Sequence, residues 1–515
     1  ASWQDIVHLV PAPRFSEADL DQHLTNTATA KDKPTESLYY LDSKADTELD
    51  FAVELVNQTR STRRREVVAA SKPVVAKVRK REEQALVTAL GKLGIDWKTG
   101  PHAPTQLVAS FAVDKPKIVA GDAFTITGTI KNTGKSPAYR VRARAKTDDE
   151  ALDGAELVFG RIDPGASKTA TVQLQTVKSA PSRAHSIQWV FDDANAAHTT
   201  APLQVLATEG VPHPRFAYSY QLVDDSNGDG LVQAGEKLHL HLRVKNVGAG
   251  RGIATVASLS SMAGDRVIVN KGRFELAAFE PGQTRDVDFT LEVRSKLDLA
   301  KLPVELVIYD SDLREGATEK LELAIRDAVA FGAGSGTVTT SAATLVHAAA
   351  AVDAEALGST KPGATLRVTG RSTNGKWARV ELEPGLPGFV PASAVSPATA
   401  APGRPEQFTR RWQSTPPALA LTATATRATA DHIAIAGAAT DDTQVDDVYV
   451  TVSNAGAKVE RRKVFYLSNR GAKAPGRLDF KAGIPLWPGS NRVTIVARES
   501  EKVKAVQALW IYRAP

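Results

Sequence analysis

A repeated pattern of alternating apolar and polar residues most constrains the fold of this 515-residue chain. The stretch VAGDAFTITGTIKNTGKSPA aligns with VQAGEKLHLHLRVKNVGAGRG, which pairs Gly121 with Gly235 and Asn132 with Asn246. Alternation with a period of two is typical of half-buried strands, and turn residues separate the strands at the short intervals of a β-sandwich. The two stretches therefore predict tandem copies of one sandwich.

Composition limits the classes of protein to which the chain can belong. Its length exceeds what one hydrophobic core supports, so several domains are expected. The absence of cysteine excludes disulfides, thiolate catalysis and thiolate metal sites. No apolar run is long enough to span a membrane. The chain starts at Ala1 and contains a single methionine, Met262, which predicts a cleaved or truncated product.

Residues 225–236, DSNGDGLVQAGE, have the spacing of a calcium loop. Alternate side chains of such a loop converge on a hard cation, and Gly230 at position six allows the sharp turn. Because the alternating sequence LHLHLRVKNVG follows, Ca²⁺ is predicted to be a structural clamp on a β domain. The predicted ligands are Asp225, Asn227, Asp229, the backbone carbonyl of Leu231, Gln233 and Glu236.

Other readings of this region remain open. The loop could be a hydrophilic turn without a metal, because Asp, Asn and Gly are common in turns. Asp310 and Asp312, at the end of a later strand, could add a carboxylate to the calcium loop. His239 and His241 alternate on one strand, but no third ligand is spaced to join them, so we favour two histidines on the wet face of that strand.

The first hundred residues have helical periodicity. One helix is predicted in TELDFAVELVNQTRS, and a second in KVRKREEQALVTALGKLGIDW, where Gly94 ends it. Basic residues cluster between Arg60 and Arg81, which could form a nucleic-acid or anionic-lipid patch. We favour a solvated helical face, without a nucleic-acid partner, because no aromatic residue is interleaved to stack on bases.

The segments DIVHLVPAPRFSEADLDQHLTN, DTELDFAVELV and ALVTALGKLGIDW resemble the region just beyond the catalytic core of bacterial carboxyl-terminal processing (tail-specific) serine proteases. In that family the catalytic Ser and Lys lie upstream of this region, so neither role carries over to a residue here. The resemblance implies a non-catalytic part of an exported protease, with the protease core as its partner. It also implies an extracytoplasmic location, in the periplasm, in the cell envelope or outside the cell.

The later modules resemble accessory domains of secreted bacterial proteins. The repeated sandwiches and the closing unit with LWPGSNRVT resemble immunoglobulin-like domains, and GKWARVELEPG with GFVPASAV resembles an SH3-like barrel. The expected fold class is mainly β and multidomain, with a helical N-terminal segment. The expected domains are a helical tail of a protease core (1–104), immunoglobulin-like sandwich 1 (105–208), sandwich 2 with the calcium loop (209–328), an SH3-like barrel (329–397), an extended linker (398–417) and immunoglobulin-like sandwich 3 (418–515).

Two aromatic residues of the SH3-like unit are candidates for ligand binding. Some domains of that family bind cell-wall peptides, and the resemblance makes Trp377 and Phe389 the candidate platform. The alternative, which we favour, is that both rings fill the core, because a barrel this small needs aromatic volume inside.

The sequence contains no H-E-x-x-H, G-x-S-x-G, S-x-x-K or phosphate-binding glycine motif, so no enzyme activity of its own is expected. Asp441, Asp442, Asp446 and Asp447 lack a fixed ligand spacing and are predicted to form a solvated acidic turn. Three functions remain possible: the accessory region of a protease, a stand-alone protein that binds the cell envelope or mediates adhesion, and an enzyme with a site between domains.

Overall fold

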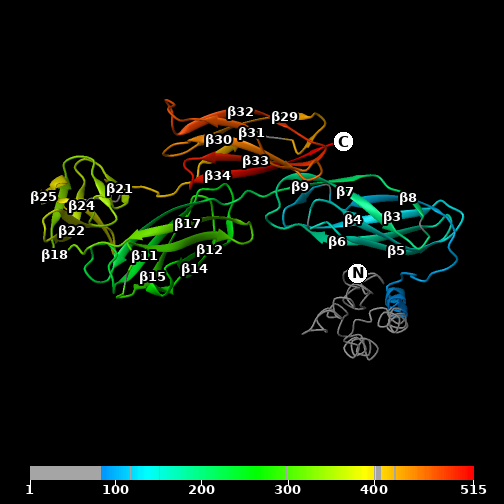
Figure 1. Ribbon diagram of the computed structural model, residues 1–515, viewed down its shortest axis with the longest axis horizontal. Coiled ribbons are helices and arrows are strands. Elements are labelled where there is room, and N and C mark those ends of the chain that lie inside the picture. Colours follow the sequence, from blue (N-terminus) through cyan, green and yellow to red (C-terminus); the bar gives the residue numbers. More distant parts are fainter. Residues whose placement is uncertain are drawn as a thin grey trace, which may run out of the picture. The chain divides into compact units, whose positions relative to one another are not determined.

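The structure is a computed structural model that describes residues 80, 83–115, 117–149, 151–195, 197–296, 298–399, 401, 407–422 and 425–514. It is mainly β and contains several separate sheets, which confirms the predicted fold class (Figure 1). The first predicted helix and most of the basic cluster lie outside the described residues. Within these ranges no helix is long and apolar enough to cross a membrane.

The second predicted helix is present. Residues 83–92 are helical, and Gly94, with a φ of 78°, follows the end of the helix (Figure 1). The backbone N–H of Ile95 donates to the carbonyl of Leu90 at 2.9 Å, so a residue with positive φ ends the helix as predicted. Leu90 and Trp97 are buried in one apolar cluster with Val158.

Sandwich 1 consists of a four-stranded and a five-stranded sheet around one core. The four-stranded sheet has the order β6–β3–β1–β8, and the five-stranded sheet has the order β2–β9–β7–β4–β5. The strands are β1 (Gln106–Val113), β2 (Ile118–Val119), β3 (Ala123–Asn132), β4 (Ala138–Lys146), β5 (Glu156–Ile162), β6 (Ser167–Gln175), β7 (Arg183–Asp192), β8 (His198–Thr200) and β9 (Gln204–Glu209).

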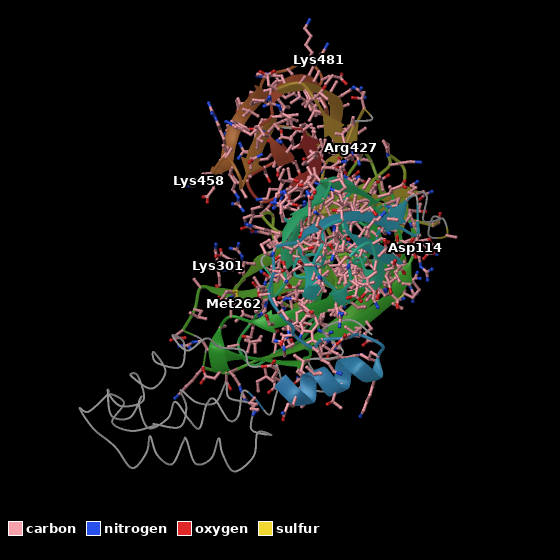
Figure 2. All side chains as sticks on the ribbon, turned by 90° about the vertical axis from the view of Figure 1, so that its right-hand side faces the viewer. Asp114, Met262, Lys301, Arg427, Lys458 and Lys481 are labelled. Atoms are coloured by element: carbon pink, nitrogen blue, oxygen red, sulfur yellow. The ribbon has the colours of Figure 1, made fainter. Side chains whose placement is uncertain are left out.

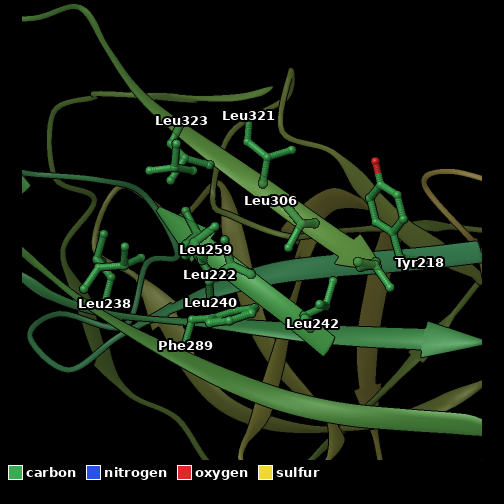
Figure 3. Packing of buried hydrophobic residues seen from close by; sticks show 14 of the residues in the cluster. Tyr218, Leu222, Leu238, Leu240, Leu242, Leu259, Phe289, Leu306, Leu321 and Leu323 are labelled. Carbon is green, nitrogen blue, oxygen red and sulfur yellow. The ribbon is translucent and has the colours of Figure 1, made fainter. Parts of the chain in front are cut away.

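Sandwich 2 has two four-stranded sheets, ordered β10–β11–β15–β13 and β14–β12–β16–β17. Alternate residues of β11 are buried, so Leu238, Leu240 and Leu242 point into the core beside Phe289 (Figure 3). The strands are β10 (Phe216–Asp224), β11 (Lys237–Asn246), β12 (Gly252–Ser261), β13 (Val267–Lys271), β14 (Arg273–Phe279), β15 (Thr284–Val293), β16 (Lys301–Asp310) and β17 (Glu315–Ala324).

The two aligned asparagines have the same structural role in both sandwiches. Asn246 is fully buried; its Oδ1 accepts from the N–H of Gly248 at 2.9 Å, and its Nδ2 donates to the carbonyls of Gly250 at 2.8 Å and Phe279 at 3.3 Å. Asn132 makes the equivalent bonds with Gly134, Ser136 and Ile162. The repeat found in the sequence therefore corresponds to a shared buried turn.

The region expected to be an SH3-like barrel is one nine-stranded sheet, which we call the small β domain (residues 329–415). Val346, Val368, Val380 and Val390 form the centre of its core. Its strands are β18 (Phe331–Ala333), β19 (Thr337–Thr340), β20 (Leu345–His347), β21 (Ala356–Thr360), β22 (Thr365–Ser372), β23 (Trp377–Glu383), β24 (Leu386–Pro391), β25 (Val395–Ala398) and β26 (Phe408–Arg410).

The expected linker 398–417 is not a free spacer throughout. Strand β26 lies inside it and pairs antiparallel with β21, where Ser359 is opposite Thr409. The backbone groups along the edge of β21 are unpaired without this strand, and pairing with β26 satisfies them. The small β domain therefore extends beyond the boundary predicted at residue 397.

Sandwich 3 has a three-stranded sheet, β27–β29–β32, and a five-stranded sheet, β28–β34–β33–β30–β31. Its core includes Val450, Phe480 and Ile495, which come from both sheets. The strands are β27 (Ala418–Leu421), β28 (Arg427–Ala428), β29 (His432–Thr440), β30 (Asp447–Asn454), β31 (Val459–Ser468), β32 (Arg477–Pro485), β33 (Gly489–Arg498) and β34 (Lys504–Arg513).

Candidate functional site

The predicted calcium loop connects β10 to β11, and the buried carboxylate of Asp224 at the end of β10 organises its first half. Oδ1 of Asp224 accepts hydrogen bonds from the backbone N–H groups of Asn227 (2.9 Å) and Gly228 (2.7 Å), and Oδ2 accepts one from Gly230 (3.0 Å). Gly228 and Gly230 have φ values of 68° and 71°, a region that favours glycine. One carboxylate thus holds a tight turn that only glycine follows without strain.

The structure differs from the prediction at loop position one. The Asp225 side chain is 58% exposed, and its Oδ2 lies 3.2 Å from Nε2 of His239. Asp224 points into the loop instead. Successive side chains of an extended chain point to opposite sides, so only one residue of the Asp-Asp pair can face inward. Asp225 therefore lies apart from the other predicted ligands.

Four other predicted ligands lie close together. The side-chain amides of Asn227 and Gln233 lie 3.0 Å apart, and the Gln233 side chain is also 3.3 Å from Oδ2 of Asp229. A carboxylate oxygen of Glu236 accepts from the backbone N–H of Gln233 at 2.8 Å. Leu231, the fifth, donates its backbone N–H to Oδ1 of Asp229 at 2.8 Å. The loop thus gathers the predicted side chains from Asn227 to Glu236.

The electrostatics of the loop favour a cation. Burial raises the pKa of Glu236, hydrogen bonds from Ser226 and the Gln233 backbone oppose the rise, and the carboxylates of Asp224 and Asp229 raise the pKa further. A divalent cation relieves such repulsion.

The donor set also suits calcium, because it consists of carboxylate and amide oxygens. Asn227, Asp229, Gln233 and Glu236 would hold the ion. Among the described residues, however, no three acidic or histidine side chains are arranged as a preformed metal site. The chemistry of the loop therefore fits calcium, and a complete ligand shell requires its side chains to close in further.

Asp229 also joins the loop to the small β domain. It is fully buried, its Oδ2 accepts from the backbone N–H of Val329 at 2.7 Å, and its carbonyl accepts from the N–H of Ala350 at 3.0 Å. Arg379 of β23 donates to the carbonyl of Gly228 at 3.0 Å. A Cβ on Gly230 would lie 2.6 Å from the Ala348 carbonyl, so this position accepts only glycine. The loop is thus part of an interface between two domains.

A network of charged side chains forms a second contact between sandwich 2 and the small β domain. Arg243 of β11 donates to both carboxylate oxygens of Glu383 at 2.8 and 2.7 Å, and Arg410 donates to the same carboxylate at 2.8 Å. Arg243 also pairs with Asp286 of β15 at 2.6 Å. These bidentate, charge-assisted bonds fix the orientation of the β23–β24 turn on the sheet.

The end of the expected linker forms a third contact. The backbone N–H of Tyr220 donates to the side chain of Gln413 at 2.6 Å, and the Gln413 side chain donates to the Tyr220 carbonyl at 3.0 Å. The N–H of Tyr218 donates to the carbonyl of Ser414 at 2.9 Å. Residues 413–414 thus act as a short strap along the edge strand β10, whose backbone groups would otherwise be unpaired.

The two alternating histidines do not form a metal site. His239 lies beside Asp225, whereas His241 is only 9% exposed and its Nδ1 lies 2.8 Å from Oδ1 of Asp288. Burial lowers the pKa of His241, but the carboxylates of Asp286, 3.7 Å from Nε2, and of Asp288 outweigh this effect and leave the pKa raised. The prediction that both histidines are solvent-exposed is therefore wrong for His241, because acidic side chains of β15 pair with it.

Asp310 does not contribute to the loop. Its buried carboxylate accepts hydrogen bonds from the N–H groups of Ile253 (2.6 Å), Ala254 (2.9 Å) and Leu313 (3.0 Å) and from the hydroxyl of Thr255 (2.8 Å). This set of donors fixes the start of β12 against the end of β16.

Trp377 and Phe389 both lie in the core, which is the alternative that the sequence favours over a ligand platform. Trp377 is 6% exposed and Phe389 is fully buried, and both belong to one apolar cluster. Phe389 packs edge-to-face on Phe331, and Trp377 packs on His347. Both rings fill the interior, because a small domain has few other sources of apolar volume.

The charged network makes the domain junction sensitive to acid. Hydrogen bonds from Arg243 and Arg410 lower the pKa of Glu383 to about 2, although burial opposes them. A depressed folded-state pKa gives stability that is present above the unfolded pKa of about 4.3 and is lost as the pH falls toward 2. Hydrogen exchange at the β23–β24 turn should therefore accelerate over that range. In the Glu383→Gln variant, hydrogen exchange at this turn should be fast already at pH 5 and should change less as the pH falls. If exchange in the variant and in the unmodified chain responded equally to pH, the Glu383 carboxylate would not be the acid-sensitive group.

The acidic turn of sandwich 3 is only partly solvated. Asp441 caps the turn by accepting from the N–H of Thr443 at 2.8 Å. Asp447, in contrast, is fully buried and pairs with both Arg498 Nε (2.9 Å) and Nη2 (2.7 Å). The prediction of a solvated turn therefore fails for Asp447, because β33 supplies a matching guanidinium.

Sequence comparison finds a similarity to a known family in one part of the chain. The CARDB family model, which describes an immunoglobulin-like β domain, matches residues 105–199 in sandwich 1. No curated protein matches the chain. One solved structure, the transglutaminase of red sea bream, has 10% identity and a TM-score of 0.18 over 48% of this chain and 34% of that one. The matched part is thus about a third of the transglutaminase, and this low similarity carries no argument about fold or function.

Proposed function

We propose that this chain is a non-catalytic accessory region of an exported carboxyl-terminal processing serine protease. Its β domains would position the enzyme and bind its substrate or the cell envelope. The observation that carries this proposal is the resemblance of residues 1–104 to the segment that follows the protease core in that family. The match of residues 105–199 to an immunoglobulin-like domain agrees with an accessory role.

In this proposal calcium stabilises the junction between sandwich 2 and the small β domain. The supporting observation is that Asp229 takes part both in the predicted ligand group and in hydrogen bonds to Val329 and Ala350. A cation that neutralises the loop carboxylates would favour the loop conformation that makes those bonds. Metal occupancy would then determine how firmly the two domains are joined.

Calcium titrated calorimetrically into the chelator-treated chain should bind at about one equivalent, with a dissociation constant on the order of 10⁻⁴ M, as in extracellular modules. Glu236→Ala should abolish this binding, because it removes a carboxylate from the loop. Asp225→Ala is the matched control and should retain it, because the Asp225 side chain points away. No binding by the unmodified chain would overturn the calcium site and leave the protease proposal standing.

The CARDB match, to a cell-adhesion-related domain, also favours a second candidate, a stand-alone protein that binds the cell envelope. The two candidates differ in what the native protein contains. An antibody against sandwich 3 should recover, from native cells, a protein whose tryptic peptides include a protease core with the catalytic Ser and Lys of the family. Recovery of a native protein without such a core would contradict the protease proposal and support the stand-alone one.

A further inference from the structure

The five-stranded sheet of sandwich 3 has an outer face on which aromatic and basic side chains lie together. The core of the sandwich uses Val450, Val452 and Ile495, so the alternate residues of β30 and β33 point outward. One outward row crosses four strands: Tyr466 is opposite Tyr449, which is opposite Val496, and Val496 is opposite Val506. Four strands span about 14 Å, and the interior residue Val496 is buried, with 5% exposure.

The two ends of this row are open. Tyr466 on β31 is 50% exposed and Val506 on β34 is 56% exposed. The adjacent row places Lys463 opposite Thr451, which is opposite Thr494, and all three residues are exposed or half-buried. An apolar and aromatic row thus lies beside a row with an ammonium group and two hydroxyls.

Positive charge dominates this face. The Nζ of Lys463 lies 4.9 Å from the centre of the Tyr449 ring and 5.4 Å from that of Tyr466, so two rings hold the ammonium in place. Lys504 extends the face on β34. Two acidic side chains at this face, Asp447 and Glu501, both pair with Arg498.

The rest of the domain has the same sign of charge. Residues 418–515 contain fourteen Lys and Arg residues against nine Asp and Glu residues, whereas the whole chain has a formal net charge of only +6. Lys458 and Lys481 project at separate places on sandwich 3 (Figure 2). The positive potential of the domain therefore attracts polyanions, and the outer face of the five-stranded sheet is where aromatic and hydroxyl groups accompany the charge.

We propose that this face binds an acidic polysaccharide, a linear chain of sugars that carry carboxylate groups. A sugar carboxylate would pair with Lys463, and sugar hydroxyls would form hydrogen bonds with Thr451 and Thr494. The apolar C–H groups of the sugar rings would pack on Tyr466 and Val506. Stacked nucleic-acid bases fit less well, because they need a series of open rings and Tyr466 is the one exposed ring of this row, Tyr449 being half-buried. This inference goes beyond the proposed function and does not depend on the calcium loop.

The test uses the full chain and sodium polygalacturonate as the probe, with binding measured by calorimetry and by retardation in affinity gels. Lys463→Glu and Tyr466→Ser should each bind about tenfold more weakly, which corresponds to one lost charged or stacking contact. Both positions are exposed on an edge strand, so the variants should fold. Lys481→Glu on β32 of the other sheet is the matched control and should bind as the unmodified chain does.

Each alternative outcome has a defined meaning. Neutral dextran should not bind, and added salt should weaken binding of polygalacturonate. If Lys463→Glu and Lys481→Glu weakened the binding of polygalacturonate equally, binding would depend on the net charge of the domain, and the assignment to this face would be wrong. No binding at all, or tighter binding of a single-stranded oligonucleotide than of polygalacturonate, would overturn the assignment to an acidic polysaccharide. None of these results depends on whether a protease core or calcium is present.

Discussion

Replacement of Asp229 by alanine should loosen the junction between sandwich 2 and the small β domain even in the presence of a chelator. The substitution leaves the buried N–H groups of Val329 and Leu231 without their acceptor. Such a buried unpaired group costs about 1–3 kcal/mol, so the two together should destabilise the junction by about 3 kcal/mol. Hydrogen exchange at the Val329 amide measures the loss directly, because that amide donates to the removed carboxylate.

Asp225→Ala provides the matched control, because Asp225 is the neighbouring acidic position of the loop and its side chain is exposed. Substitutions at such surface positions usually change stability by less than about 0.5 kcal/mol. Equal acceleration of exchange in Asp225→Ala and Asp229→Ala would contradict the placement of these two side chains.

Replacement of Phe389 by alanine should unfold the small β domain at much lower denaturant concentration. The ring is fully buried against Phe331, and removal of a buried Phe side chain costs about 3–5 kcal/mol. Because the chain has several domains, one global transition cannot be assumed. Hydrogen exchange along β23 and β24 should therefore be followed separately from exchange in sandwich 3, which should not change.

Phe389→Leu retains most of the apolar volume and should cost less than half as much, which separates packing from any need for an aromatic ring. Exchange of β24 in Phe389→Ala that equals that of the unmodified chain would mean that the ring is not part of the core. In that case a role of Trp377 and Phe389 in ligand binding would again be possible.

The sequence predicted the repeated sandwiches because their signals are local. Alternation identifies a half-buried strand, and the paired asparagines mark a turn whose partners lie two and four residues ahead. Gly94 likewise marks the end of the second helix within a few residues. The sequence has two adjacent aspartates, Asp224 and Asp225, and either could point into the loop. The spacing of a calcium loop predicts Asp225, whereas Asp224 is the residue that points inward.

The residues of the domain junction gave no such signal. Arg243, Glu383 and Arg410 are far apart in the sequence, and each alone is typical of an exposed strand or turn. The linker composition predicted a free spacer, since it does not reveal that the edge strand β10 needs partners for its backbone groups. Both features depend on which surfaces meet after each domain has folded.

Neighbours in the chain therefore encode the strands, the turns, the repeat and the oxygen-rich loop. The inward position of Asp224, the burial of Phe389 and the contact of Asp229 with a second domain arise only when the chain is packed. This difference arises because the burial of a side chain, and the partner of its hydrogen bonds, depend on which two surfaces come into contact. Only packing brings those surfaces together, whereas backbone conformation is largely set by each residue and its nearest neighbours.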